Sequence, residues 1–198
     1  MKEVQKQEWE KESEWESHWW GNCINTFGEE QKHFDYAPKM GIKFYWDAQG
    51  PHIDAKGLKI LDVGGGPVSM LLKCVNLGQG HIVDPCDYPE WTTKRYGSAG
   101  ITVSKCQAED MDVKGFDEVW MYNLLQHVQD PAKIVANSLR AGKIVRVFDW
   151  LEIAGPGHPH YLVEDEMNKW FKGEGKVETI KGGKCYTGVF PGEGYEPK

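Results

Sequence analysis

The sequence has few cysteines and no arrangement of them that suggests a disulfide framework or a metal site. Their number is odd, and no two form a C-x-x-C pair: they are Cys23, Cys74, Cys86, Cys106 and Cys185. Scattered cysteines of this kind are typical of free thiols in a reducing compartment. We therefore predict a cytoplasmic protein with no disulfide framework and no bound metal.

Long apolar runs are also missing. None approaches the roughly 20 apolar residues that a membrane-spanning helix needs. The first residues are polar and charged, unlike the apolar centre of a secretory signal. We expect a soluble protein with no membrane partner.

Positive charge is in short supply. The chain has 23 Lys and Arg residues against 30 Asp and Glu residues, a formal net charge of −7 at pH 7. A dedicated nucleic-acid binder gains its affinity by neutralising phosphates, so we expect a small-molecule partner and no nucleic acid. The length of 198 residues allows one domain with a substantial core. The oligomeric state is left open.

What the chain does have is a short apolar run that contains an acid and ends at a glycine loop. Ile60, Leu61 and Val63 surround Asp62, and residues 64–66 are all glycine. The apolar residues predict a buried parallel strand. Glycines directly after such a strand allow a sharp turn and a close approach of the backbone to a ligand. The charge of Asp62 would repel a dinucleotide pyrophosphate and suits a cationic or zwitterionic ligand.

A second acid follows the next predicted strand. Residues 81–83 are apolar or aromatic and lead into Asp84, which stands 84 − 64 = 20 positions after Gly64. At this spacing a doubly wound sheet places a carboxylate beside the ribose of a nucleotide, where it can accept strong hydrogen bonds from both hydroxyls. The alternative is that Asp84 forms an Asx-turn before Pro85.

Asp62 and the glycine loop after it resemble motif I of the class I S-adenosylmethionine-dependent methyltransferases, an acid followed by a Gly-x-Gly-x-Gly loop. Gly64 and Gly66 match its first two glycines, and Val68 stands at the third. Residues 125–131, Leu-Gln-His-Val-Gln-Asp-Pro, resemble the family's turn of leucine, any residue, histidine, two residues and aspartate-proline. The resemblance implies S-adenosylmethionine as the cofactor, S-adenosylhomocysteine as the product, and methyl transfer by an in-line SN2 displacement.

The resemblance also implies an α/β fold, with a Rossmann-like seven-stranded sheet that is mostly parallel, ends in an antiparallel C-terminal hairpin and carries helices on both faces. Apolar runs and alternation predict strands at 60–63, 81–83, 101–104, 116–122, 143–149, 176–180 and 184–190. Helical spacing and capping residues predict helices at 3–20, 27–40, 68–76, 88–96, 132–141 and 162–171. In the helix at 68–76, Leu71, Leu72 and Val75 are expected to face the sheet.

We divide the chain into an N-terminal helical extension at 1–55 and a single globular methyltransferase domain at 56–198. By resemblance, the extension covers the ligand cleft as a lid. Trp19, Trp20 and Tyr45 would then wall the pocket and exclude water. The alternative for each of them is simple packing.

The predicted cofactor site combines the two motifs with positions that the resemblance implies. Gln107 stands where the family has an acid that meets adenine, and the backbone near Ala108 or the side chain of Glu109 could contribute there. Glu109 could equally belong to a solvated loop. Asn123 would lie near the methionine amino group. The predicted cofactor-binding residues are Asp62, Gly64, Gly65, Gly66, Asp84, Gln107, Ala108, Glu109, Asn123 and Trp20.

His127 and Asp149 are the predicted catalytic residues. Both follow neighbouring predicted strands, and a carboxylate beside an imidazole fixes the tautomer of a general base. The alternative is that His127 packs the turn or shapes the methionine pocket. We predict methyl transfer to a small molecule, with O-methylation of a metabolite or sugar favoured. The competing hypotheses are a nicotinamide-dependent oxidoreductase and a non-catalytic S-adenosylmethionine-binding module.

Overall fold

The structure, a computed structural model, describes residues 6–21, 23 and 25–196. Its helices are α1 (Lys6–Trp20), α2 (Thr26–Lys39), α3 (Glu90–Ser98), α4 (Pro131–Ala141) and α5 (Glu164–Phe171), with short 3-10 helices η1 (Met70–Lys73) and η2 (Ala108–Asp110). Its strands are β1 (Phe44–Asp47), β2 (Gly50–Asp54), β3 (Lys59–Val63), β4 (Cys74–Val75), β5 (Gln79–Val83), β6 (Ile101–Ser104), β7 (Phe116–Tyr122), β8 (Gly142–Leu151), β9 (Lys176–Ile180) and β10 (Gly183–Pro191). The predicted helix start at residue 3 lies outside the described residues.

The main sheet has seven strands in the order β6-β5-β3-β7-β8-β10-β9. Strands β6, β5, β3, β7 and β8 run parallel, while β10 pairs antiparallel with both β8 and β9. This arrangement confirms the predicted fold class, including the C-terminal hairpin. The register sets Asp62 on β3 beside Ile82 of β5 and Trp120 of β7, so the first motif lies at the centre of the sheet.

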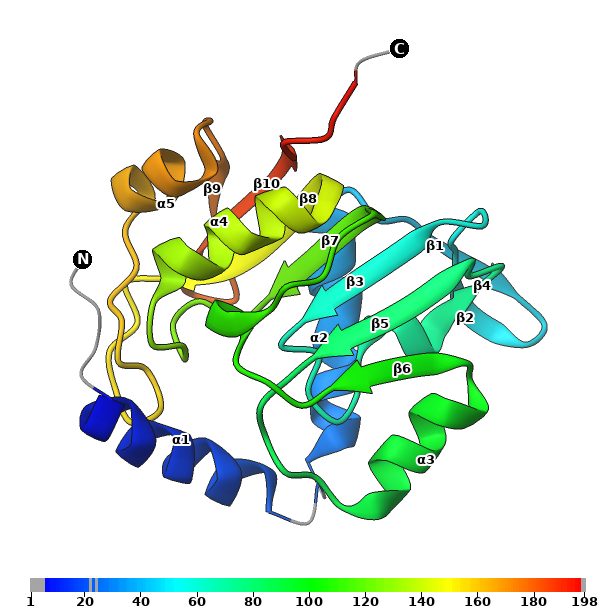
Figure 1. Cartoon of the computed structure of the whole chain (residues 1–198), viewed down its shortest axis with the longest axis horizontal. Helices are drawn as coiled ribbons and strands as arrows, with labels where there is room; N and C mark the ends of the chain where they lie inside the picture. The colour runs from blue at the N-terminus through cyan, green and yellow to red at the C-terminus, as the bar shows by residue number, and fades with distance from the viewer. Residues whose placement is uncertain (1–5, 22, 24, 197–198) are drawn as a thin grey trace.

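Helices cover both faces of this sheet (Figure 1), and the alternation of side chains along the strands decides what each helix meets. Leu61 and Val63 of β3 join one buried cluster with residues of α4 and α5. Ile60 joins the opposite cluster with residues of α2. In Figure 1, α1 runs across the end of the sheet toward which the parallel strands point.

Helix α4 shows how local sequence defines an element. The side chain of Asp130 accepts a hydrogen bond from the backbone N–H of Lys133 at 3.0 Å, and Pro131 occupies the first turn. Ile134 and Leu139 are buried against the sheet. The helix ends at Ala141, before Gly142, as the sequence predicts.

Residues 44–54 form a β-hairpin that the sequence analysis did not predict. Strands β1 and β2 pair antiparallel, and β2 pairs parallel with β4 through Ile53 and Cys74. This three-stranded sheet crosses the predicted boundary at residues 55 and 56. Ile53 also shares a buried cluster with Ile60, so the N-terminal segment and the main sheet have a common core.

The predicted helix at 68–76 is wrong. The chain makes one 3-10 turn, where the Ser69 hydroxyl accepts from Leu71 N at 3.0 Å, and then extends into β4. Ser69 caps the start of this turn, and β2 offers a backbone partner for residues 74 and 75, which are therefore extended. Leu71 is buried as expected, but Val75 is 41 % exposed.

Within residues 6–21, 23 and 25–196, no helix is long and apolar enough to cross a membrane.

Two glycines give opposite predictions for stability. A Cβ at Gly78 would lie 2.1 Å from the backbone oxygen of Gly57, whereas a Cβ at Gly97, within α3, would meet nothing within 4 Å. We expect Gly78→Ala to lower the free energy of unfolding by about 1–3 kcal/mol, the usual cost of overpacking. Gly97→Ala should raise it by about 0.5–1 kcal/mol because alanine favours the helix.

Urea unfolding of the two variants beside the wild type measures both changes. Equal stability of the Gly78 variant and the wild type would contradict the close approach of the two backbone segments.

Candidate functional site

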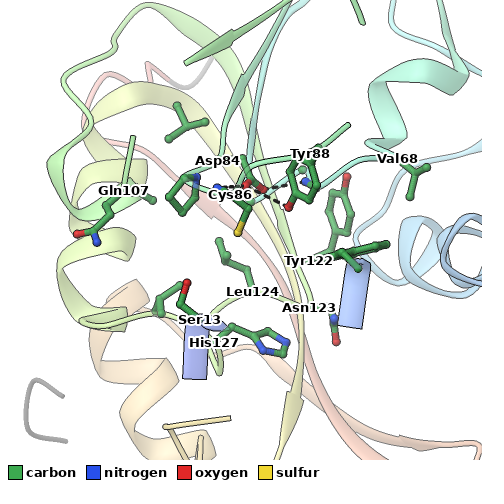
Figure 2. A pocket seen from close by; sticks show the side chains of 18 of the residues that line it. Ser13, Val68, Asp84, Cys86, Tyr88, Gln107, Tyr122, Asn123, Leu124 and His127 are labelled. Carbon is green, nitrogen blue, oxygen red and sulfur yellow. Dashed lines mark hydrogen bonds between the residues drawn. The ribbon is translucent and has the colours of Figure 1, made fainter. Parts of the chain in front are cut away.

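A cavity lies at the carboxyl edge of the main sheet, lined by residues that follow β3, β5, β6 and β7 and by residues of α1 and α2 (Figure 2). It encloses about 970 Å³, including the solvent space at its mouth. In Figure 2, Asp84, Cys86 and Tyr88 lie on one side, Ser13 and His127 on the other, and Leu124 between them.

The glycine loop after β3 forms part of the cavity wall, and its geometry requires bare backbone. Gly64 and Gly66 have φ of +72° and +60°, which disfavours other residues. A Cβ at Gly64 would lie 2.4 Å from Leu124 Cδ1. The loop therefore offers backbone to the cavity at close range.

Asp62 lies beneath this loop and not at the cavity surface. It is fully buried, and its Oδ2 accepts hydrogen bonds from the hydroxyls of Ser69 and Tyr122. Its Oδ1 is buried with no hydrogen-bond partner among the described residues. Burial raises the pKa of Asp62 to about 7, although the two hydroxyls oppose the shift.

Two tyrosine hydroxyls hold the backbone between the glycine loop and η1. Tyr122 accepts from Met70 N at 3.0 Å. Tyr96 accepts from Ser69 N at 2.9 Å and donates to Gly66 O at 2.7 Å. The N–H groups at the start of a helix have no partner within it, and these bonds satisfy those of Ser69 and Met70. The loop is therefore positioned by side chains from α3 and β7.

Asp84 lines the cavity, and its carboxylate is tied to the chain around it. Its Oδ2 accepts from Gly66 N at 2.9 Å, while its Oδ1 accepts from Cys86 N at 2.9 Å and from Tyr88 OH at 3.2 Å. The bond from Cys86 N is the Asx-turn that the sequence allowed. The contact of Asp84 with a ribose stays a prediction. Burial raises the pKa of this carboxyl.

The predicted pair of His127 and Asp149 is not supported. Asp149 is fully buried outside the cavity lining, with its oxygens accepting from Leu124 N at 3.1 Å, Leu125 N at 2.7 Å and Trp150 N at 3.0 Å. Burial raises its pKa to about 7. Asp149 therefore fixes the turn after β7, because backbone amides of that turn have taken its acceptor positions.

His127 does line the cavity, but both of its ring nitrogens have neighbours in the structure. Nδ1 lies 2.6 Å from Gly157 O and Nε2 lies 3.2 Å from Gln126 Nε2. Burial lowers the pKa of His127 to about 4, so the ring is neutral near pH 7. These contacts favour the alternative that His127 packs the turn.

Searches for similar proteins found likeness in structure and none in sequence. No family model and no curated sequence matches the chain. The N-terminal domain of EvdMO1, solved with SAH (S-adenosylhomocysteine) bound, matches with a TM-score of 0.52 and 16 % identity over 69 % of this chain and 75 % of that one. The magnesium protoporphyrin IX methyltransferase ChlM of Synechocystis PCC 6803, also with SAH, matches with a TM-score of 0.51 and 11 % identity over 68 % and 73 %.

A third match is a chain of the complex between the Haloferax volcanii Trm112 methyltransferase activator and its candidate methyltransferase. Its TM-score is 0.60, with 13 % identity over 87 % of this chain and 96 % of that one. The 198-residue chain therefore has the class I S-adenosylmethionine-dependent methyltransferase fold. At such low identities the matches establish the fold alone.

Within this methyltransferase fold, the cavity brings together most of the predicted cofactor residues. Its lining includes Gly64, Gly65, Gly66, Asp84, Gln107, Ala108, Glu109, Asn123 and Trp20. Asp62 is the exception, because the glycine loop covers it. Trp20 reaches the cavity from the end of α1, whereas Trp19 and Tyr45 lie outside the lining.

The segment predicted to meet adenine divides into two roles. Glu109 Oε1 accepts from Gln129 N at 2.9 Å and from Asp130 N at 3.0 Å, so its carboxylate holds the entry to α4. Gln107 also lines the cavity, and within the described residues its side-chain amide has no hydrogen-bond partner. Asn123, with φ of +52°, accepts from Gln126 Nε2 at 3.1 Å through Oδ1.

The N-terminal extension was expected to wall the cavity through Trp19, Trp20 and Tyr45, but most of the residues of α1 and α2 that line it were not predicted. Glu29, His33 and Tyr36 of α2 line the cavity together with Trp9 and Ser13 of α1. The three residues of α2 follow the spacing i, i+4, i+7 of one helix face. This spacing is visible in the sequence, but the helix was predicted from its apolar residues, which lie on a different face.

Replacing Asp62 with Asn should alter the pH dependence of stability. The pKa of Asp62 rises from 3.8 to about 7 on folding, so the folded protein binds a proton more tightly than the unfolded chain between these values. The stability that Asp62 contributes is therefore present at low pH and is lost as the pH rises through this window, by about 1.4 kcal/mol per unit of pKa shift. The free energy of unfolding of Asp62→Asn, minus that of the wild type, should increase from about pH 4 to about pH 7.

Urea unfolding at a series of pH values measures this difference. Asp112→Asn, which changes an exposed carboxyl, is the matched control and should leave the slope unchanged. A difference for Asp62→Asn that is constant with pH would contradict the raised pKa.

Proposed function

We propose that the protein transfers a methyl group from S-adenosylmethionine to a hydroxyl of a small molecule. The observation that carries this proposal is that the Gly64–Gly66 loop and Asp84 form one wall of a single cavity at the carboxyl edge of the sheet. This edge is where open parallel sheets bind their ligands.

The residues of this wall fit the cofactor. The glycine loop presents bare backbone to the cavity, because a side chain at its positions would be strained or would clash. Asp84 presents a carboxylate to the same cavity. A ribose hydroxyl would replace the bond from Tyr88 OH, which at 3.2 Å is the longest that Asp84 accepts. Gln107 and Trp20 would meet the base, and Asn123 the amino acid portion. S-adenosylmethionine would supply a methyl group activated by its sulfonium.

The protein's part in the reaction is to orient the acceptor and exclude water. The opposite wall comes from α1 and α2, which enclose the space beside the cofactor wall. A net charge of −7 favours a small molecule over a nucleic acid as the acceptor.

Replacing Asp84 with Asn should weaken binding of S-adenosylhomocysteine by roughly tenfold, because a hydrogen bond to a charged group contributes about 1.5–3 kcal/mol. Isothermal titration calorimetry measures the affinity. Asp87→Asn, an exposed carboxyl close in sequence, is the control and should bind as the wild type does.

Titration with NAD tests the oxidoreductase hypothesis in the same cell. Binding of NAD in place of S-adenosylhomocysteine would overturn the proposed cofactor. Binding of S-adenosylhomocysteine without turnover of any small-molecule hydroxyl would support the non-catalytic binding module instead.

We infer further that α1 acts as the lid of the cavity. Gly157 N donates to Glu12 Oε2 at 2.5 Å, and a Cβ at Gly157 would lie 2.8 Å from the Trp15 ring. Helix α1 therefore rests on the loop after β8 through a small contact, while Trp9 and Trp20 face the cavity.

Gly157→Ala should loosen this contact, and hydrogen exchange of the α1 amides should become faster. The control is Gly182→Ala, which has a similar φ, +82° against +78°, but no atom within 4 Å of the added Cβ. Both variants carry similar backbone strain. Equal exchange rates of α1 in the two variants would contradict the lid.

A further inference from the structure

His33 is a buried histidine with no hydrogen bond to satisfy it. It lies on α2, its residue is 4 % exposed, and it lines the cavity. No hydrogen bond joins its ring to the described residues, and its Nδ1 is buried without a partner. A buried polar group left in this state costs stability and calls for an explanation.

The surroundings of His33 are aromatic. The ring of Tyr122 meets it edge to face at 5.5 Å, and Tyr36 follows it on the same face of α2. Trp9 of α1 adds further aromatic surface to the lining. Flat, apolar walls of this kind suit an aromatic ring.

Two other polar side chains of the lining already have partners within the protein. Glu29 accepts from Lys32 Nζ at 2.6 Å, and His127 has a neighbour at each ring nitrogen. The Ser13 hydroxyl of α1 also lines the cavity. A sugar, which carries many hydroxyls, would need several polar partners to replace the water it loses. This wall suits a ligand with one hydroxyl near His33.

We propose that the cavity takes an aromatic compound with a ring hydroxyl as its methyl acceptor, and that His33 is the catalytic residue that accepts the hydroxyl proton. This inference rests on the proposed function. As the oxygen forms its bond to the methyl carbon, the sulfur–carbon bond breaks and that electron pair stays on sulfur. The proton passes to the imidazole of His33, which later releases it to solvent.

The protonation state of His33 agrees with this role. Burial lowers its pKa to about 3, with the charges of Lys73 and Lys32 acting in the same direction. The ring is therefore neutral near pH 7 and able to accept a hydrogen bond. A weak base suffices, because an oxygen that is being methylated becomes strongly acidic.

The test is calorimetric binding of 2-naphthol to the protein saturated with S-adenosylhomocysteine, with 2-methoxynaphthalene as the matched probe that lacks the hydroxyl. His33→Phe keeps an aromatic ring and should weaken 2-naphthol binding by about tenfold or more, while changing the affinity for 2-methoxynaphthalene little. His33→Gln keeps a hydrogen-bond acceptor, so it should hold 2-naphthol but lose its turnover. His52→Phe, on the β1–β2 hairpin outside the lining, is the control and should behave as the wild type.

Thermal unfolding separates this role from simple packing. His33→Phe removes an unsatisfied polar atom, so its melting temperature should be unchanged or higher, whereas a histidine needed for packing would lower it. Equal 2-naphthol affinity in His33→Phe and the wild type, or preferred binding of methyl glucoside by the wild type, would overturn the inference. In either case, the proposed function would stand if S-adenosylhomocysteine binds to the wild type and to His33→Phe. If S-adenosylhomocysteine does not bind to the wild type, the proposed function itself is overturned.

Discussion

The buried carboxylate of Asp62 is the constraint on which the cofactor wall depends. Its residue has no exposed surface, and the carboxylate is held by the hydroxyls of Ser69 and Tyr122. Removing a carboxylate from water is costly, and the raised pKa is the sign of that cost. The hydroxyls offset part of it and at the same time join β3, η1 and the end of β7. The glycine loop above Asp62 is thereby set in place.

Side-chain hydroxyls here perform a task that a helix performs in many nucleotide-binding sheets. The chain after the glycine loop has only the 3-10 turn η1, whose four residues cannot present a long helix dipole. Tyr96 and Tyr122 bond instead to the backbone of residues 66–70. The site thus relies on specific hydrogen bonds to hold the loop and on Asp84 to fix Gly66 from the other side.

The two walls of the cavity have different origins. The cofactor wall consists of strand ends and the loops that follow them, so the sheet positions it. The acceptor wall comes from α1 and α2, which reach the cavity from outside the sheet (Figure 1). In the proposed reaction, the first wall would hold the cofactor and the second would select the acceptor.

Much of the sheet was predictable from the sequence. Strands β3, β5 and β7 each contain a short run of apolar residues with turn residues beside it, and Asp84 was singled out by its spacing from Gly64. The errors arose where distant residues competed with local preference. The segment at 68–76 has helical spacing, yet it makes only a 3-10 turn before residues 74 and 75 pair with the neighbouring strand β2 as β4. His127 follows β7 and Asp149 lies near the end of the adjacent strand β8, but backbone amides of the turn after β7 bond to the Asp149 carboxylate.

By itself, the sequence determined where the strands of the main sheet lie along the chain, the glycine loop after β3 and the acid at the end of β5. Each of these depends on residues close together in the chain. The tertiary structure alone decided that Asp62 lies beneath the loop, that Asp149 fixes a turn, and that His33 faces the cavity without a partner. Those outcomes depend on contacts between segments far apart, such as Asp62 with Tyr122, 60 positions away. No local pattern encodes which of several polar side chains will be nearest when such segments pack.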